Sequence, residues 1–218
     1  GTLILQNAFL GTISSLTVES GAMLESEEVF SGRVEELRIS ENGGAQLSGG
    51  RFGAIRCSDG RTAKNLLSEK HAFYNNTDTH AAVLCSTLIS EDTPLQNVEV
   101  DVCKHTAIDA HGNCAYCGMH CVAECVVSGT TSYYKDLQSA LDNIRGGTVK
   151  LLENTGGSRF VAKQAGTLDL NGKTLNGAFM HTESFTIQDS SQTPGKIESL
   201  VAGAGTTISG GSFGSIQV

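Results

Sequence analysis

The stretch Gly32-Arg-Val-Glu-Glu-Leu37, followed by Gly43-Gly-Ala-Gln-Leu-Ser-Gly-Gly-Arg-Phe-Gly-Ala-Ile55, recurs near the other end of the chain. The second copy reads Gly195-Lys-Ile-Glu-Ser-Leu200 and then Ala204-Gly-Thr-Thr-Ile-Ser-Gly-Gly-Ser-Phe-Gly-Ser-Ile216, with two residues fewer between its parts. Chance does not explain such a match, and internal repetition is the signature of architectures built from one repeated structural unit. The repeat therefore indicates a solenoid.

Apolar residues alternate with polar ones inside each copy, but only over short runs, and Gly, Ser, Asn and Glu fill the gaps. Runs this short predict strands that are too short for a β-sandwich. A solenoid stacks each strand on the equivalent strand of the next turn, so the inward side chains form ladders. We therefore expect an all-β chain, a parallel β-helix, in which the motifs around Phe9, Phe52 and Phe213 each place a phenylalanine in the interior.

The second half of the chain continues this pattern after one amphipathic segment. Strand-like stretches recur at solenoid spacing in residues 148–152, 167–171, 184–188 and 196–200. Before them, residues 133–144 carry their apolar side chains on one face of a helix, with Ser132 as the expected N-cap and two glycines as the stop. We expect this single short α-helix to cap the open end of a solenoid, where apolar side chains and strand edges are otherwise exposed.

Two segments carry a resemblance to a known family. The run from Tyr134 to Leu152 and the run Thr167-Leu-Asp-Leu-Asn-Gly-Lys-Thr-Leu175 resemble the start of a pectin-lyase-like right-handed parallel β-helix. Residues 60–74 are similar to the closing segment of solenoids in repeat-bearing surface proteins of gut and oral Firmicutes. The resemblance implies right-handed β-helical segments, and a bacterial cell-surface or secreted protein of the adhesin type, because many members of this superfamily are adhesins or stalks.

Composition and charge narrow the function further. The 218 residues include 26 glycines, two prolines and no tryptophan, which suits short strands joined by tight turns. A net charge of -8, without a basic patch, would repel a phosphate backbone, so we expect no nucleic-acid partner. No apolar run is long enough for membrane insertion. The chain begins and stops within the repeat pattern, so we interpret it as a segment of a longer protein.

The strongest local motif is Cys103-Lys-His105, followed by Cys114-Ala-Tyr-Cys117-Gly118. Two close pairs of soft ligands supply the four positions of a tetrahedral structural zinc site, and a glycine after the last cysteine permits the tight knuckle turn. Residues 109–113 supply the turn between the pairs. The sequence therefore predicts a zinc ion held by these four residues, and the arrangement resembles zinc-ribbon-like inserts of the Firmicutes surface proteins.

Other arrangements of the seven cysteines stay open at this point. Disulfides could join Cys103 to Cys114 or Cys121 to Cys125 if the chain is extracellular. Other side chains also compete as metal ligands: His111, His120, Cys121 and Cys125. An iron-sulfur cluster on Cys114, Cys117, Cys121 and Cys125 is disfavoured because its spacing fits no known pattern. Cys57 and Cys85 are expected to pack as small apolar residues or to pair with each other.

Catalysis has weaker support in the sequence. β-Helical lyases and glycosidases need converging acidic side chains and a basic residue. The local candidates are scattered singly among polar residues: Arg159, Asp169, Lys173 and Asp189. We therefore expect no catalytic residues, although a fragment of a β-helical polysaccharide lyase or glycoside hydrolase stays the alternative function.

These observations define an expected organisation. It comprises a first solenoid segment over 1–56, a closing segment and linker over 57–100, a zinc-knuckle-like module over 101–125, and a second solenoid over 128–218. The expected function is that of a non-enzymatic stalk or adhesin, whose partner is a polysaccharide or a host surface ligand.

Overall fold

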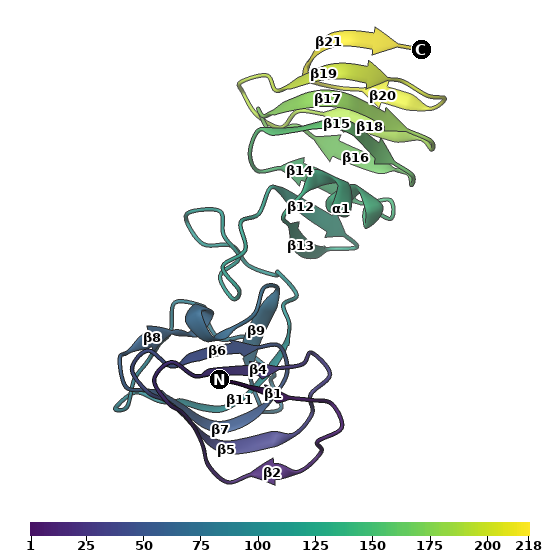
Figure 1. The fold of residues 1–218 in the computed structure, drawn as a ribbon. Helices are drawn as coiled ribbons and strands as arrows, with labels where there is room; N and C mark the ends of the chain where they lie inside the picture. The colour runs from purple at the N-terminus through teal and green to yellow at the C-terminus, as the bar shows by residue number, and fades with distance from the viewer. The chain divides into compact units, whose positions relative to one another are not determined.

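The computed structural model describes residues 1–218, and the chain divides into two compact units. Unit 1 comprises Gly1–Lys104 with Ala115–Met119, and unit 2 comprises His105–Cys114 with His120–Val218. In each unit, short strands of successive turns pair in parallel to form stacked sheets, as the ribbon shows (Figure 1). The predicted all-β parallel solenoid with a single short α-helix is therefore confirmed.

Unit 1 begins with two parallel sheets. The first contains β1 (Thr2–Leu5), β4 (Met23–Ser26) and β6 (Gly44–Leu47). The second contains β2 (Thr12–Ile13), β3 (Leu16–Val18), β5 (Arg33–Ile39) and β7 (Gly50–Cys57). Alternate residues of several strands face inward, as in β4, where Leu24 and Ser26 are buried. In β5 the alternation holds for Leu37 and Ile39 but is interrupted between Val34 and Leu37. This alternation is what the short apolar runs of the sequence encode.

The strand direction reverses where unit 1 closes. Beyond β7, the chain forms β8 (Arg61–Thr62), the 3-10 helix η1 (Ala63–Leu66), β9 (His71–Asn75), β10 (Leu88–Ile89) and β11 (Leu95–Val102). β11 lies antiparallel between β7 and β9, and β8 pairs antiparallel with β10. β11 pairs with β9 as far as Val102, so this strand continues past the boundary predicted at residue 100.

Unit 2 stacks its strands in two further sheets. One contains β13 (Thr130–Tyr134), β12 (Ala123–Val127), β14 (Thr148–Leu151), β16 (Gly166–Asp169), β18 (Phe185–Gln188) and β20 (Thr206–Ile208). The other contains β15 (Thr155–Ala162), β17 (Thr174–His181), β19 (Lys196–Val201) and β21 (Ser212–Gln217). From β14 onward all pairs are parallel, whereas β12 is antiparallel to both β13 and β14.

The helix of unit 2 is shorter than the sequence predicts. The helix α1 spans Leu137–Asp142, not 133–144, and its N-cap is Asp136 rather than Ser132. The Asp136 carboxylate accepts a hydrogen bond from the Ser139 amide at 2.8 Å. Tyr133 and Tyr134 belong instead to β13, because pairing with β12 satisfies their backbone groups. The cap of the solenoid is thus a β-hairpin followed by a short helix, and none of the helices is long and apolar enough to cross a membrane.

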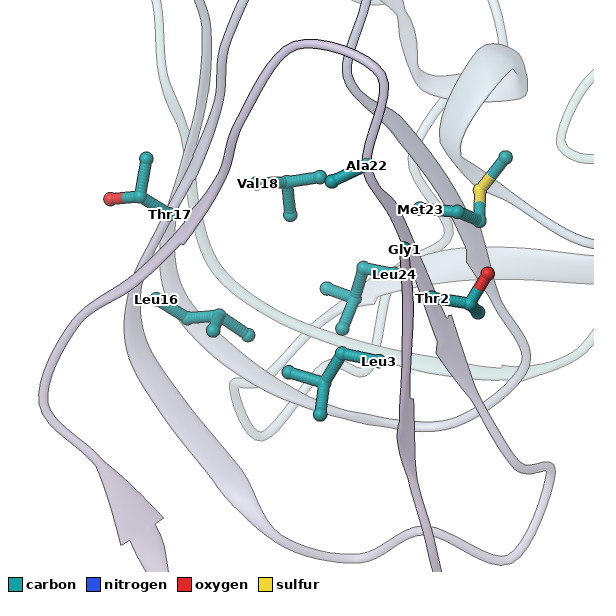
Figure 2. A pocket seen from close by; sticks show the side chains of 9 residues that line it. All are labelled: Gly1, Thr2, Leu3, Leu16, Thr17, Val18, Ala22, Met23 and Leu24. Carbon is teal, nitrogen blue, oxygen red and sulfur yellow. The ribbon is translucent and has the colours of Figure 1, made fainter.

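A pocket of about 260 Å³ opens at the end of unit 1 formed by β1, β3 and β4. Leu3, Leu16, Val18 and Leu24 point toward one another there, whereas Thr17 and Met23 point away (Figure 2). Val18 and Leu24 belong to the unit 1 core, and Leu16 packs against it. Leu3 is 47% exposed, whereas Leu24 is 1% exposed.

Candidate metal centre

The first pair of predicted ligands follows directly from β11. The Cys103 amide donates a hydrogen bond to the Lys70 carbonyl at 2.7 Å, which fixes the backbone just after the strand. His105 has a φ of 46°, a left-handed conformation that turns the chain sharply. Its carbonyl accepts a hydrogen bond from the Tyr133 amide at 2.9 Å. Backbone bonds therefore hold both members of the Cys-x-His pair in place.

The second pair follows a turn organised by Asp109. Its carboxylate accepts hydrogen bonds from the amides of His111 and Asn113 at 2.8 and 3.0 Å. These two bonds, Asn113 first, lower the pKa of Asp109 below its ordinary value. After Cys117, Gly118 has a φ of 71°, which a residue with a side chain adopts only with strain. The turn and the glycine together make the knuckle that the spacing indicates.

The four side chains lie close together. Cys103, His105, Cys114 and Cys117 each offer one ligand atom, and these atoms all lie within 4.8 Å of one another. Cys103 and Cys114 are buried, while His105 and Cys117 are half-buried. Four ligands at Zn–S distances of about 2.3 Å in a tetrahedron are separated by roughly 3.8 Å, so a small inward movement completes coordination. Three thiols and one imidazole fit a four-coordinate ion in donor chemistry as well as in spacing.

The competing ligands lie outside this group. Those that the sequence left open are His111, His120, Cys121 and Cys125. His120 contacts Asn113 Oδ1 at 3.2 Å and Glu153 Oε2 at 2.9 Å through its two ring nitrogens. Cys125 lies on β12 with its thiol in the unit 2 core, where burial raises its pKa. The geometry thus groups only the four residues of the motif.

Cys57 is a core residue of unit 1. It carries a free thiol at 0% exposure, and burial raises its pKa to about 11. Cys125 is likewise a free thiol. The alternative pairings of Cys57 with Cys85 and of Cys121 with Cys125 are therefore not formed in this structure.

Sequence reasoning missed Lys64, which lies beside the knuckle. Its ammonium donates a hydrogen bond to the Gly118 carbonyl at 3.4 Å. Gly118 follows Cys117 directly, so this contact links η1 to the turn that carries the fourth ligand. No signal in the sequence links Lys64 to Gly118, because the fold of η1 alone brings this lysine near.

The acidic candidates for catalysis act as turn residues. Asp169 Oδ1 accepts hydrogen bonds from the backbone amides of Asn171 and Ser190, each with an N–O distance of 2.9 Å. The carboxylate thus joins two neighbouring turns of the solenoid. Asp189 accepts the amides of Gly172 and Ser191 in the same manner. These carboxylates hold backbone amides rather than facing each other across a groove.

A pH dependence follows for Asp169. Burial raises its pKa, but the hydrogen bonds from Ser190, Asn171 and Gln188 outweigh burial and lower it below the ordinary value. The stabilisation is therefore present above the unfolded pKa of about 3.9 and is lost as pH falls through the lower folded value. We expect Asp169→Asn to lower the stability of unit 2 by about 2 kcal/mol at pH 7. Denaturant unfolding at pH 7 and in acid measures the difference.

The control for this prediction is Glu183→Gln, which removes an exposed carboxylate from the same unit. It should leave unfolding at pH 7 within about 0.5 kcal/mol of the unsubstituted chain. Equal stability of the Asp169→Asn and Glu183→Gln variants at pH 7 would show that the amide contacts of Asp169 contribute nothing.

Comparison of the chain with protein-family models, with curated proteins and with solved structures gives no match. The strand pairing of this chain shows the solenoid architecture, and the distances between ligand atoms show the Cys/His cluster. The pectin-lyase-like family and the Firmicutes surface-protein type stay expectations from the sequence.

Proposed function

We propose that Cys103, His105, Cys114 and Cys117 bind one zinc ion, which has a structural role. The observation that carries this proposal is the convergence of four ligand atoms within 4.8 Å in a segment with little core of its own. Zinc accepts mixed thiolate and imidazole ligands without a geometric preference of its own. Four protein ligands leave no position for a reactive water, so the ion would stabilise the knuckle rather than catalyse a reaction.

The larger role proposed for the chain is that of a non-enzymatic stalk or adhesin segment of a bacterial cell-surface or secreted protein. Each of the two units contains parallel sheets of a β-solenoid with polar residues at outward-facing positions, and this supports the role. Stacking of successive turns makes a solenoid stiff and places its outward side chains in regular rows. Ser, Thr and Asn on such rows suit contacts with a polysaccharide or a host surface protein. The amide contacts of Asp169 and Asp189 favour this role over the alternative, a lyase or glycosidase fragment.

Metal analysis of the purified chain with a parallel thiol count tests the zinc site. We expect about one zinc per chain. Chelation should release the thiols of Cys103, Cys114 and Cys117 to a thiol reagent at pH 8. Cys57 should stay unreactive in the folded chain, because a pKa of about 11 leaves little thiolate at this pH. The zinc assignment would be wrong if the chain contained no metal and its thiols reacted only after a reductant was added. That result would show that disulfides, and not zinc, hold this segment.

The role as stalk or adhesin needs a separate experiment. The metal-loaded chain is screened against an array of bacterial and host glycans and is incubated with the same polysaccharides in solution. Retention of the chain on glycans supports an adhesin if the polysaccharides in solution gain neither new reducing ends nor unsaturated products. Catalytic turnover that is abolished by Asp169→Asn or Asp189→Asn would instead identify the enzyme alternative.

A further inference from the structure

Unit 2 has a pocket of about 190 Å³ where the β12–β13 hairpin meets the residues that follow α1 (Figure 1). Cys125 of β12 and Ser132 of β13 lie opposite each other in the antiparallel ladder, and both line this pocket. Thr130 and Tyr134 lie two residues to either side of Ser132, so their side chains share its face of the strand. Arg145, which follows α1, also lines the pocket. Three hydroxyl groups, one thiol and one guanidinium therefore surround a single small space.

Arg145 carries the only charge among the side chains that line this pocket. Burial raises the pKa of Tyr134 above its ordinary value, so its hydroxyl stays protonated at pH 7. Burial and, to a lesser extent, Glu124 raise the pKa of the Cys125 thiol, which is neutral at this pH as well. Glu124 itself alternates with Cys125 along β12 and contacts Tyr133, so its carboxylate lies on the opposite face of the hairpin. The pocket thus presents one cation and several neutral hydrogen-bonding groups.

The guanidinium of Arg145 also has no acidic partner within the chain. Of the seven arginines in the sequence, five lie 2.6–3.7 Å from a carboxylate oxygen, namely Arg33, Arg38, Arg51, Arg56 and Arg61. The other two, Arg145 and Arg159, form no ion pair, and Arg159 Nε instead contacts Met180 Sδ at 2.8 Å. The positive charge of Arg145 is therefore available to a ligand.

The backbone at Arg145 is strained. This residue has a φ of 40°, in the left-handed region, where a side chain is unfavourable and a glycine is not. Residues held in such conformations concentrate at binding and active sites. The strain accompanies a side chain that lines the pocket, so it supports a binding role for Arg145.

We propose that this pocket binds one carboxylate-bearing sugar ring of an acidic glycan, an inference that rests on the proposed role of the chain as a glycan-binding segment. A guanidinium donates two parallel hydrogen bonds to a carboxylate, and this geometry distinguishes an acidic sugar from a neutral one. The hydroxyls of Thr130, Ser132 and Tyr134 both donate and accept, as the hydroxyls of a sugar require.

Size and charge limit the ligand further. A volume of about 190 Å³ is smaller than the sites of roughly 300–1,000 Å³ that enclose drug-sized molecules, so the pocket holds one ring and not several. A phosphate monoester carries about two negative charges at neutral pH, whereas the pocket offers one cation. A sugar carboxylate carries one charge and matches Arg145 alone.

An NMR titration of the full 218-residue chain tests this proposal. The probes are methyl glucuronide and methyl glucoside, which differ only in a carboxylate against a hydroxymethyl group. We expect the glucuronide to shift the amide resonances of residues 130–134 and 143–147 and to bind about tenfold or more tightly than the glucoside. Added salt should weaken the binding of the glucuronide, because ions screen an exposed charge.

The variant Arg145→Gln should bind the two sugars equally weakly, because it removes the charge and keeps a polar side chain. The matched control is Arg159→Gln, which changes the other arginine of unit 2 without an acidic partner and leaves the pocket unaltered. It should keep the preference for the glucuronide. Tyr134→Phe removes a hydroxyl but no charge, so it should weaken the binding of both sugars by the same factor. This second variant tests the pocket even if Arg145→Gln disturbs the end of α1.

Four outcomes would overturn the assignment of this pocket. These are the absence of shifts in residues 130–134 and 143–147 up to the solubility of the glucuronide, equal binding of the two sugars by the unsubstituted chain, equal binding of the glucuronide by Arg145→Gln and Arg159→Gln, and tighter binding of inorganic phosphate than of the glucuronide. Retention of the chain on neutral glycans that Arg145→Gln does not change would leave the adhesin role standing without this pocket. Absence of binding to any glycan would overturn both proposals.

Discussion

A Cys114→Ser variant is expected to lose its zinc. The substituted hydroxyl is a poor ligand for this ion, and Cys114 is one of the two buried ligands of the cluster. Loss of a partner that merely orients a ligand already costs up to about 100-fold in metal affinity, so loss of the ligand should exceed this factor. The zinc content after gel filtration and a competition titration with a chromophoric chelator measure the change.

The control for this variant is Cys57→Ser. Both cysteines are 0% exposed, so both substitutions bury a hydroxyl, but only Cys114 belongs to the cluster. Cys57→Ser should therefore keep one zinc per chain even if it lowers the stability of unit 1. If both variants retain zinc with the same affinity, Cys114 is not a ligand and the assignment of the quartet is wrong.

The second large effect is expected for Phe52→Ala in unit 1. Phe52 lies on β7, which pairs with β5 on one side and with β11 on the other, and its side chain is fully buried in the unit 1 core, so truncation leaves a cavity there. Such substitutions cost about 3–5 kcal/mol. Hydrogen exchange of the β5 and β7 amides in increasing denaturant reports the stability of unit 1 separately from unit 2.

Phe9→Ala is the matched comparison, because Phe9 begins a similar motif but is 40% exposed. Its ring stacks on Phe30 with centroids 6.4 Å apart, so a loss of about 1 kcal/mol is expected. Equal losses for Phe52→Ala and Phe9→Ala would show that coverage by β11 does not determine the stability of the β7 turn.

The phenylalanine motifs show how far the sequence predicts this fold. Their similarity correctly indicates repeated turns, and Phe52 is in the interior as expected. The prediction is wrong for Phe9, and Phe213 is only half-buried. Burial depends on whether another strand lies on the far side, as β11 does for Phe52. A repeat motif does not contain this information, because it describes one turn and not its neighbours.

The sequence predicts the ligand cluster better than it predicts the cap of unit 2. Residues 133–144 have a helical pattern, yet Tyr133 and Tyr134 are in a strand because the first parallel turn of unit 2 needs an antiparallel cover. The cluster of Cys103, His105, Cys114 and Cys117 is readable because its ligands are close in sequence. Lys64 is distant in sequence from Gly118, so its contact could be found only from the structure.

The reversal of strand direction at β12 also affects how this chain could form misassembled material. A parallel edge can template the addition of further strands of like sequence in register, which is the first step toward fibres. The antiparallel β12–β13 hairpin ends the parallel stack on one side of unit 2. A strand added beyond β13 would therefore extend the sheet past an antiparallel pair and would not continue the parallel register of the stack.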